Sequence, residues 1–508
     1  MANYSNQRII KNTAFLYVRM VVVMIISLYT SRLILQTLGV DDYGLYNVVG
    51  GIVLLFSLIN NALSAGTSRF ITFELGRNDK DRLRNTFSAA FFIHLAVAVF
   101  VLILTETIGL WYVNNIMVVP PERLTAANYV YQFSIVTCML SLTQVPYSAA
   151  IIAHEKMSIY AWVGIADAVA KLVLLLLLVY VLKGDNLILY GLIIMLVTIG
   201  MQVFYRFYCH RYYEESKLLW VKDKSYYKSM LSFSLWDIIG ATTIHGYSQG
   251  VNLLMNYFFS LSVNAAKGVA YKVQHYVNLF SSNYLTATRP QIVKLFAEGN
   301  IDKMKKLVVE TSKISFYLLA IVAVPLFIET EYVLNLWLTE VPELTALFLR
   351  LIIVVSMMRS FATPIVHAVH ATGNIKQLNL YSGGASLLLN LPLTYLAYIL
   401  GAPAEYTFYI LIGATLICNY IELLCLKREI GFNIIKYTID VYLRSMLVTI
   451  PAFAVSLLLC HFVPSSFLRL ILVSFFSILL LLGFAYCFGI SERTKEEINS
   501  IIKKKIGK

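Results

Sequence analysis

The residues of this sequence that could do chemistry are charged side chains inside long apolar runs. The basic ones are Arg19, Arg32, Lys171, Lys267, Lys272, Arg350 and Arg359. The acidic ones are Asp167 and Asp237, with Glu106 and Glu422 near the ends of such runs. Each charge placed in hydrocarbon costs about 2.5–3.5 kcal/mol on insertion scales. Because cations outnumber acids, these runs are predicted to border a hydrated space that an anion visits.

Helical spacing gathers these charges with other polar residues on single helix faces, since residues three or four positions apart share a face. One predicted face carries Lys267, Tyr271, His275, Asn278 and Ser282. A second carries Ser234, Asp237, Ala241, His245, Ser248, Asn252 and Asn256. A third carries Ser356, Arg359, Thr363, His367 and His370. A polar face cannot point into lipid, so each one meets either another helix or water.

Both outcomes remain open at this stage. Hydrogen bonds between helices account for most single Ser, Thr or Asn residues, whereas Arg19, Lys267, Lys272 and Arg359 favour a cavity. Asp167 and Lys171 are four residues apart and are predicted to pair with each other. Arg19 and Asp237 occupy matched places in a repeat described below, and they are predicted to approach each other in one state. The histidines are candidate proton carriers, although a satisfied hydrogen-bond partner is the commoner role.

Motifs for covalent chemistry and nucleotide binding are missing from the sequence. It contains no P-loop, no Gly-x-Gly-x-x-Gly before a helix, and no His-Glu-x-x-His. None of the six cysteines forms a Cys-x-x-Cys pair, which leaves no metal-ligand spacing. We therefore expect no catalytic residue, no metal site and no cofactor, and we expect that the protein is not an enzyme.

The composition is that of a membrane protein. Of the 508 residues 59% are hydrophobic and 14% are charged, whereas a soluble domain carries about 25% charged residues. A chain this poor in charge cannot cover its surface in water, so lipid must be its main solvent. The net charge of +13 lies in short segments between apolar runs; nucleic acid is therefore not an expected partner, and the charge sets topology instead.

Apolar runs long enough to cross a bilayer predict an all-α integral membrane protein with about fourteen transmembrane helices. They fall near 13–36, 45–67, 87–109, 127–152, 158–182, 187–208, 229–257, 265–288, 313–335, 345–371, 377–400, 406–426, 440–462 and 467–489. Most of the 41 basic residues lie on one side of this topology. The positive-inside rule then places both termini in the cytoplasm, as an even number of spans requires.

The chain also repeats itself. Phe15–Tyr29 aligns without a gap on Phe233–Tyr247, and the Glu106-Thr107 pair is echoed by Glu329-Thr330. The second copy starts an even number of helices after the first, so both copies share one orientation and are related by an axis along the membrane normal. The predicted parts are a six-helix lobe at 1–222, a second six-helix lobe at 223–430, and a segment at 431–508 with two more helices and a basic cytoplasmic tail.

The first predicted helix and the residues after it carry a recognisable pattern. This pattern consists of Arg32 followed by Leu38-Gly39 and Tyr43-Gly44, and it resembles the first-helix signature of bacterial polysaccharide flippases. These proteins belong to the multidrug/oligosaccharidyl-lipid/polysaccharide exporter (MOP) superfamily, and the resemblance covers most of the chain. It implies two bundles around a central cavity, with cationic cavity residues on the first, second, seventh and eighth helices. The residues that match are Arg19, Arg32, Arg69, Lys267 and Lys272.

The resemblance also implies a function. The expected substrate is an oligosaccharide linked to undecaprenyl pyrophosphate, moved from the cytoplasmic to the outer leaflet of the bacterial inner membrane for O-antigen or capsule assembly. Arg19, Arg32, Lys267, Lys272 and Arg359 would bind the pyrophosphate. Polar or gating roles would fall to Asp237, His245, His275, Asn278 and Arg69. A polysaccharide polymerase and glycosyltransferases would be its protein partners.

Two other functions stay open from the sequence. A cation-coupled multidrug exporter of the same superfamily would need an acidic cavity, which the excess of Lys and Arg disfavours. A membrane scaffold for polysaccharide enzymes would transport nothing. The sequence does not distinguish the glycan that is carried or the source of energy.

Overall fold

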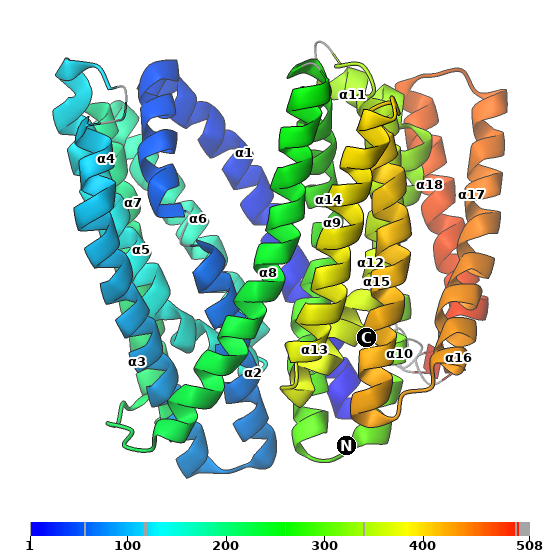
Figure 1. Ribbon diagram of the computed structural model, residues 1–508, viewed down its shortest axis with the longest axis horizontal. Coiled ribbons are helices and arrows are strands. Elements are labelled where there is room, and N and C mark those ends of the chain that lie inside the picture. Colours follow the sequence, from blue (N-terminus) through cyan, green and yellow to red (C-terminus); the bar gives the residue numbers. More distant parts are fainter. Residues whose placement is uncertain are drawn as a thin grey trace, which may run out of the picture. The chain divides into compact units, whose positions relative to one another are not determined.

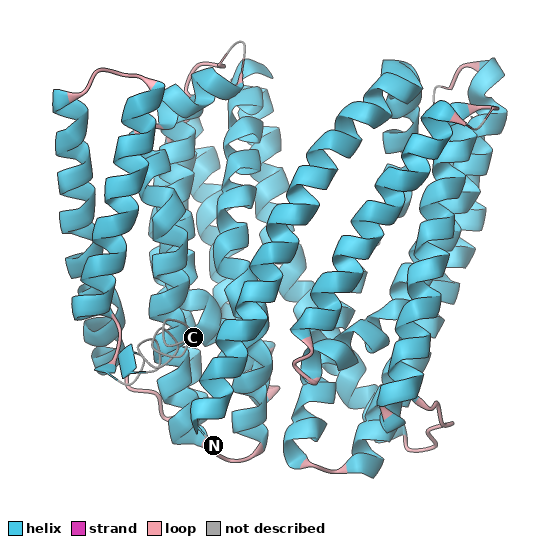
Figure 2. Cartoon of the chain, turned by 180° about the vertical axis from the view of Figure 1, so that it is seen from behind, coloured by secondary structure: helices cyan, strands magenta, loops and turns pink. Residues whose placement is uncertain are grey.

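The computed structural model describes residues 2–496, apart from 55–56, 116, 118, 182, 260, 339–340 and 493–494, and it leaves out some side chains of α1, α2, α8 and α9. All regular secondary structure in the described part is helical, which confirms the predicted all-α class (Figures 1 and 2). The chain divides into two compact units, residues 10–238 and residues 1–9 with 239–508. We call these the N-terminal unit and the C-terminal unit.

The first helix is interrupted where the sequence pattern predicts a turn between two spans. Helix α1 (Ala2–Leu54) contains one non-helical residue, Gly39, with φ 77° and ψ 175°. An L residue with a side chain rarely adopts this φ, so glycine is the residue that allows the chain to turn here. The interruption divides α1 into two stretches. The first contains the predicted span 13–36, whereas the predicted span 45–67 is shared between the second stretch, which ends at Leu54, and α2 (Ser57–Arg77).

An ion cluster holds the segment that follows this turn. Arg123 pairs with Asp42 and, at 2.6 Å, with Asp185. Asp185 also caps α7 by accepting hydrogen bonds from the backbone N–H groups of Leu187 and Ile188. Asp42 directly precedes the Tyr43-Gly44 pair of the signature described above, and its ion pair gives it a structural role within the N-terminal unit.

The N-terminal unit is built around α5. Its helices are α2 (Ser57–Arg77), α3 (Lys80–Leu104), η1 (Thr105–Gly109), α4 (Leu110–Asn115), η2 (Pro121–Arg123), α5 (Leu124–Ala153), α6 (Met157–Tyr180), α7 (Asn186–Tyr212) and η3 (Glu214–Ser216). Helix α5 contacts α2, α3 and α7, and α6 packs on α7. Large side chains of α5, such as Tyr131 and Tyr147, are almost fully buried in this core.

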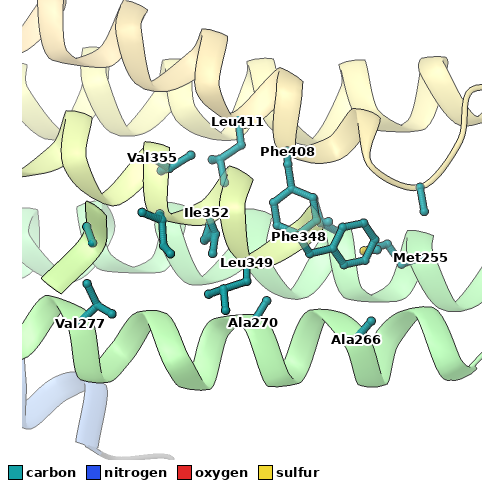
Figure 3. Close-up of a cluster of buried hydrophobic side chains, with 14 of the residues drawn as sticks. Met255, Ala266, Ala270, Val277, Phe348, Leu349, Ile352, Val355, Phe408 and Leu411 are labelled. Atoms are coloured by element: carbon teal, nitrogen blue, oxygen red, sulfur yellow. The ribbon is translucent and has the colours of Figure 1, made fainter. Parts of the chain in front are cut away.

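The C-terminal unit is built around α12. It contains most of α8 (Lys224–Phe258), then α9 (Leu261–Ala297), α10 (Ile301–Ile328), α11 (Thr330–Trp337), α12 (Thr345–Thr372), α13 (Lys376–Leu378), η4 (Asn379–Gly383), α14 (Gly384–Ile399) and α15 (Tyr406–Ile430). Phe348 of α12 and Phe408 of α15 lie 4.7 Å apart, between their ring centroids, in its apolar core (Figure 3).

Two further helices, α17 (Arg444–Phe462) and α18 (Phe467–Phe484), lie side by side and pack on α10 (Figure 1). The short elements α16 (Ile434–Tyr437), η5 (Thr438–Leu443) and η6 (Ala485–Gly489) flank them. These helices fall in the same compact unit as the second lobe, whereas the sequence set 431–508 apart. The boundary between the units lies at 238–239, inside α8 and later than the predicted 222–223.

The contacts of corresponding helices recur in both units. Helix α5 contacts α2, α3 and α7, while α12 contacts α9, α10 and α15. Likewise α6 packs on α7, and α14 packs on α15. This recurrence is what the sequence repeat predicts, since the second copy begins at α8.

Ten helices in the described part are long and apolar enough to cross a membrane. The predicted spans missing from this set are 45–67, 229–257, 265–288 and 377–400. The second and third correspond to α8 and α9, which carry many polar residues. The fourth corresponds to η4 and α14 (Gly384–Ile399), and α14 alone has 16 residues. The chain is a multi-span membrane protein, and two of its helices, α8 and α9, are too polar to be recognised as spans by composition.

Candidate functional site

Lys267 is the most deeply buried cation of the predicted set. It lies on α9, and 4% of its surface is exposed. Its ammonium group donates a hydrogen bond of 2.6 Å to Asn252 Oδ1 of α8, and it lies 5.5 Å from the ring centroid of Tyr271. Asn252 and Lys267 belong to two different predicted polar faces, so the structure brings these faces together at this point.

A small pocket surrounds Lys267 within the C-terminal unit. Its lining comes from α8, α9, α14 and α15, and consists of Tyr247, Ser248, Val251, Lys267, Tyr271, Asn390, Thr407, Phe408 and Leu411. The cavity volume is about 10 Å³, which is room for about one water. Phe408 and Leu411 belong to the apolar core, which therefore forms one wall (Figure 3).

Two polar residues of this lining were not predicted from the sequence. Asn390 and Thr407 lie more than a hundred residues beyond Lys267, on α14 and α15. Asn390 was visible as a single polar residue in an apolar run, and its side chain is only 2% exposed. Nothing in the sequence indicates, however, that α14 approaches α9.

Lys272 does not share this environment. It is exposed, and its ammonium group lies 5.9 Å from the ring centroid of Trp337. Five residues along a helix correspond to a rotation of about 140°, so Lys267 and Lys272 point to different sides of α9. His275 is also exposed and Asn278 is partly buried. The predicted polar face of α9 is also divided, since Lys267 points into the unit while His275 lies on its surface.

Arg359 of α12 is neutralised by a neighbouring carboxylate. Its Nη1 donates to Glu422 Oε1 at 2.9 Å and to Asn419 Oδ1 at 2.8 Å, both on α15. The Glu422 side chain is 4% exposed and also accepts a hydrogen bond from Ser382. The sequence favoured a cavity for Arg359 and put Glu422 near the end of a span, whereas in the structure Glu422 is buried within α15 and pairs with Arg359.

Arg19 packs inside the N-terminal unit. Its guanidinium carbon lies 4.6 Å from the ring centroid of Tyr160, on α6. Gly164, one turn further along α6, leaves space for this arginine: a Cβ atom there would come within 2.3 Å of Arg19 Nε. Nearby on α6, Lys171 donates a hydrogen bond of 2.8 Å to Asp167, which confirms the predicted pair.

Replacing Gly164 with alanine is expected to push Arg19 away from Tyr160. The lost cation–π contact should lower the free energy of unfolding by about 1–2 kcal/mol relative to a matched variant. Gly200→Ala in α7 is that variant, since no atom lies within 4 Å of a Cβ there and it gains the same helix propensity. Equal unfolding free energies for the two variants, measured in detergent, would contradict this placement of Arg19.

Arg69 of α2 is enclosed by aromatic rings. It is 7% exposed, and its guanidinium carbon lies 4.6 Å from the ring centroid of Phe70, 5.0 Å from that of Phe73 and 5.7 Å from that of Phe233. The resemblance implies a polar or gating role for this residue, which stays a prediction; the structure places it between α2 and the first part of α8. An arginine covered by three phenylalanines supports the packing of these helices.

The remaining predicted residues give less information. Asp237 is partly exposed on α8, and its predicted approach to Arg19 stays a prediction. The side chains of Arg32 and His245 lie outside the described part of the structure. In that part, no group of three or more His, Cys, Asp or Glu side chains is placed to hold a metal ion.

Comparisons with known proteins give a result at the level of the fold. No protein-family model matches the sequence, and no curated protein matches it. The structure is similar to the outward-facing conformation of a multidrug resistance MATE family transporter of the MOP superfamily. The TM-score is 0.73 at 13% identity, over 84% of this chain and 96% of that one.

Two more solved structures are similar in the same way. One is MATE in the straight conformation, with a TM-score of 0.71 at 14% identity over 84% of this chain and 96% of that one. The other is a MOP superfamily transporter from Pyrococcus furiosus, with a TM-score of 0.69 at 12% identity over 83% of this chain and 96% of that one. The chain thus has the two-lobe fold of twelve helices found in MATE transporters.

Proposed function

We propose that this chain, with its MOP superfamily transporter fold, moves an oligosaccharide linked to a lipid pyrophosphate across a bacterial inner membrane. One observation carries the proposal. Three cations of the membrane helices, Arg19, Lys267 and Lys272, have aromatic or amide partners and no described carboxylate within ion-pair distance. Their charge has to be balanced by water or by an anionic ligand.

The partners of three acids in the apolar helices support an anionic substrate over a cationic one. Asp167 pairs with Lys171, Glu422 with Arg359, and Glu329 with Arg469. A carboxylate that is already paired attracts a cationic drug weakly. For the Pyrococcus furiosus transporter, reverse polarity of the binding pocket suggests a different function. In this chain, the cations without a described carboxylate partner likewise support a function other than the export of cationic drugs.

The pyrophosphate would meet the exposed cation rather than the enclosed one. Lys272 is exposed on α9, with His275 one turn away. The pocket around Lys267 has room for about one water and is too small for a pyrophosphate. Lys267 therefore makes no direct contact with the pyrophosphate, which revises the role that the sequence suggested for it.

Transport of a labelled undecaprenyl-pyrophosphate oligosaccharide into proteoliposomes tests the proposal. Lys272→Gln and Arg19→Gln should each lower the initial rate at least about tenfold, because a hydrogen bond or ion contact to a charged group contributes ~1.5–3 kcal/mol. Arg350→Gln is the matched control. Arg350 pairs with the exposed Glu331 at 3.2 Å, and this variant should keep the native rate.

Two outcomes would overturn the proposal. Native protein that exports a cationic dye and leaves the labelled lipid in place would indicate the multidrug exporter. Native protein that moves neither molecule, while remaining folded in the vesicles, would indicate a scaffold. Equal rates for native protein and both glutamine variants would reject the assignment of the cations.

A further inference from the structure

The pocket around Lys267 poses a problem of charge balance that the transported substrate does not solve. A buried ammonium group costs several kcal/mol when nothing neutralises it. The described partners of Lys267 are the amide oxygen of Asn252 and the ring of Tyr271, and both are uncharged. Among the described residues that line the pocket there is no Asp or Glu.

The pocket lining instead supplies hydrogen-bond donors. The side chains of Tyr247, Ser248 and Tyr271 each carry a hydroxyl group, and no hydrogen bond is described for any of these three hydroxyls. Asn390 and Thr407 complete the polar side, with Asn390 donating to Ser386 O and Thr407 lying 3.4 Å from Thr394. These three side chains are partly buried. Each hydroxyl can donate one hydrogen bond, and an acceptor placed in the pocket would also meet the ammonium group.

Size and chemistry together define the acceptor. The free space admits about one particle of the size of water, so a phosphate, a sugar or a carboxylic acid is too large. The particle should be negative, because it faces an ammonium group. It can be a spherical ion without fixed acceptor directions, because the hydroxyls come from two different helices, α8 and α9.

We propose that the Lys267 pocket binds a single monoatomic inorganic anion of the chloride class. The anion accepts hydrogen bonds from the Lys267 ammonium group and from the surrounding hydroxyls, and it neutralises the lysine. It thereby stabilises the contact between α8 and α9 inside the C-terminal unit. This role does not depend on which molecule the protein transports.

Thermal unfolding of the purified full-length protein in detergent tests the site. The melting temperature is measured in sodium chloride, sodium bromide and sodium gluconate at equal ionic strength, because gluconate is too large for the pocket. Chloride and bromide should raise the melting temperature of the native protein by about 2–4 °C relative to gluconate. Lys267→Met, which keeps the length of the side chain and removes its charge, should abolish this difference.

Lys272→Met is the matched control, since it removes a cation from the exposed side of the same helix. This variant should keep the full chloride effect. Equal melting temperatures of the native protein in the three salts would overturn the proposal. A chloride effect that persists in Lys267→Met would overturn it as well, because the anion would then bind elsewhere.

A second measurement covers the case in which Lys267→Met does not fold. The NMR line width of chloride, measured with native protein in nanodiscs, should broaden on protein addition, and bromide should reverse the broadening by competition. Lys267→Arg keeps the positive charge and enlarges the side chain into the small pocket, so it should remove the broadening while the protein stays folded. Broadening of the same size with Lys267→Arg would reject the site.

Discussion

Glu329→Ala is expected to lower the free energy of unfolding by about 3–5 kcal/mol, the loss typical of breaking a buried ion pair by removing one partner. The Glu329 side chain, at the end of α10, is fully buried. Arg469 of α18 donates to it from Nε at 2.7 Å and from Nη2 at 2.9 Å, and Cys460 lies 3.4 Å away. The alanine variant would leave the 18%-exposed Arg469 guanidinium without its carboxylate, with the uncharged acceptors Val463 O and Ser465 Oγ remaining.

The free energy of unfolding is measured in mixed micelles for this variant and for two comparison variants. Glu331→Ala breaks the more exposed pair with Arg350 and should cost at most about 1 kcal/mol. Glu329→Leu combined with Arg469→Leu should recover most of the stability, because an apolar pair of similar volume needs no desolvated charges. If Glu329→Ala costs no more than Glu331→Ala, the pair does not hold α18 on α10.

Arg359→Leu is expected to have an effect of similar size. It leaves Glu422, whose side chain is 4% exposed, with Ser382 as its described remaining donor. Leaving a buried carboxylate without its cation costs about 3–5 kcal/mol. Arg359 was also a candidate pyrophosphate ligand, and this variant separates the two roles through protein stability.

The result is read from unfolding free energy together with transport in proteoliposomes. If the role of Arg359 is structural, Arg359→Leu should lower the free energy of unfolding strongly, and Arg359→Leu with Glu422→Leu should restore most of it. The double variant should then also transport the labelled lipid. A ligand role predicts normal stability in Arg359→Leu and no transport in either variant. That second outcome would reject the structural role that we assign to the Arg359–Glu422 pair.

The Glu329–Arg469 pair also shows how the two repeats differ. Glu329 corresponds in the sequence repeat to Glu106 of the N-terminal unit. Glu106 accepts a hydrogen bond of 3.2 Å from Gln132 and is partly exposed. The helices α17 and α18 add the arginine and bury the carboxylate in the second unit. The same position is therefore a surface hydrogen bond in one repeat and a buried ion pair in the other.

The sequence by itself determined the features that depend on local spacing and composition. Poverty of charge and long apolar runs predict a helical membrane protein, because backbone groups in lipid must be satisfied within each span. The matching of Phe15–Tyr29 with Phe233–Tyr247 predicts the repeat that the helix contacts show again. The Asp167–Lys171 pair was predictable because its members are one helical turn apart.

Only the tertiary structure decided which charges are neutralised. Arg359 and Glu422 are 63 residues apart, and Arg469 and Glu329 are 140 apart; periodicity gives the face of a helix but not the helix that this face meets. The same limit hid the pocket of Lys267, which needs Asn390 and Thr407 from distant helices. Which cations stay available to an anion was therefore settled by the packing of helices and not by their individual sequences.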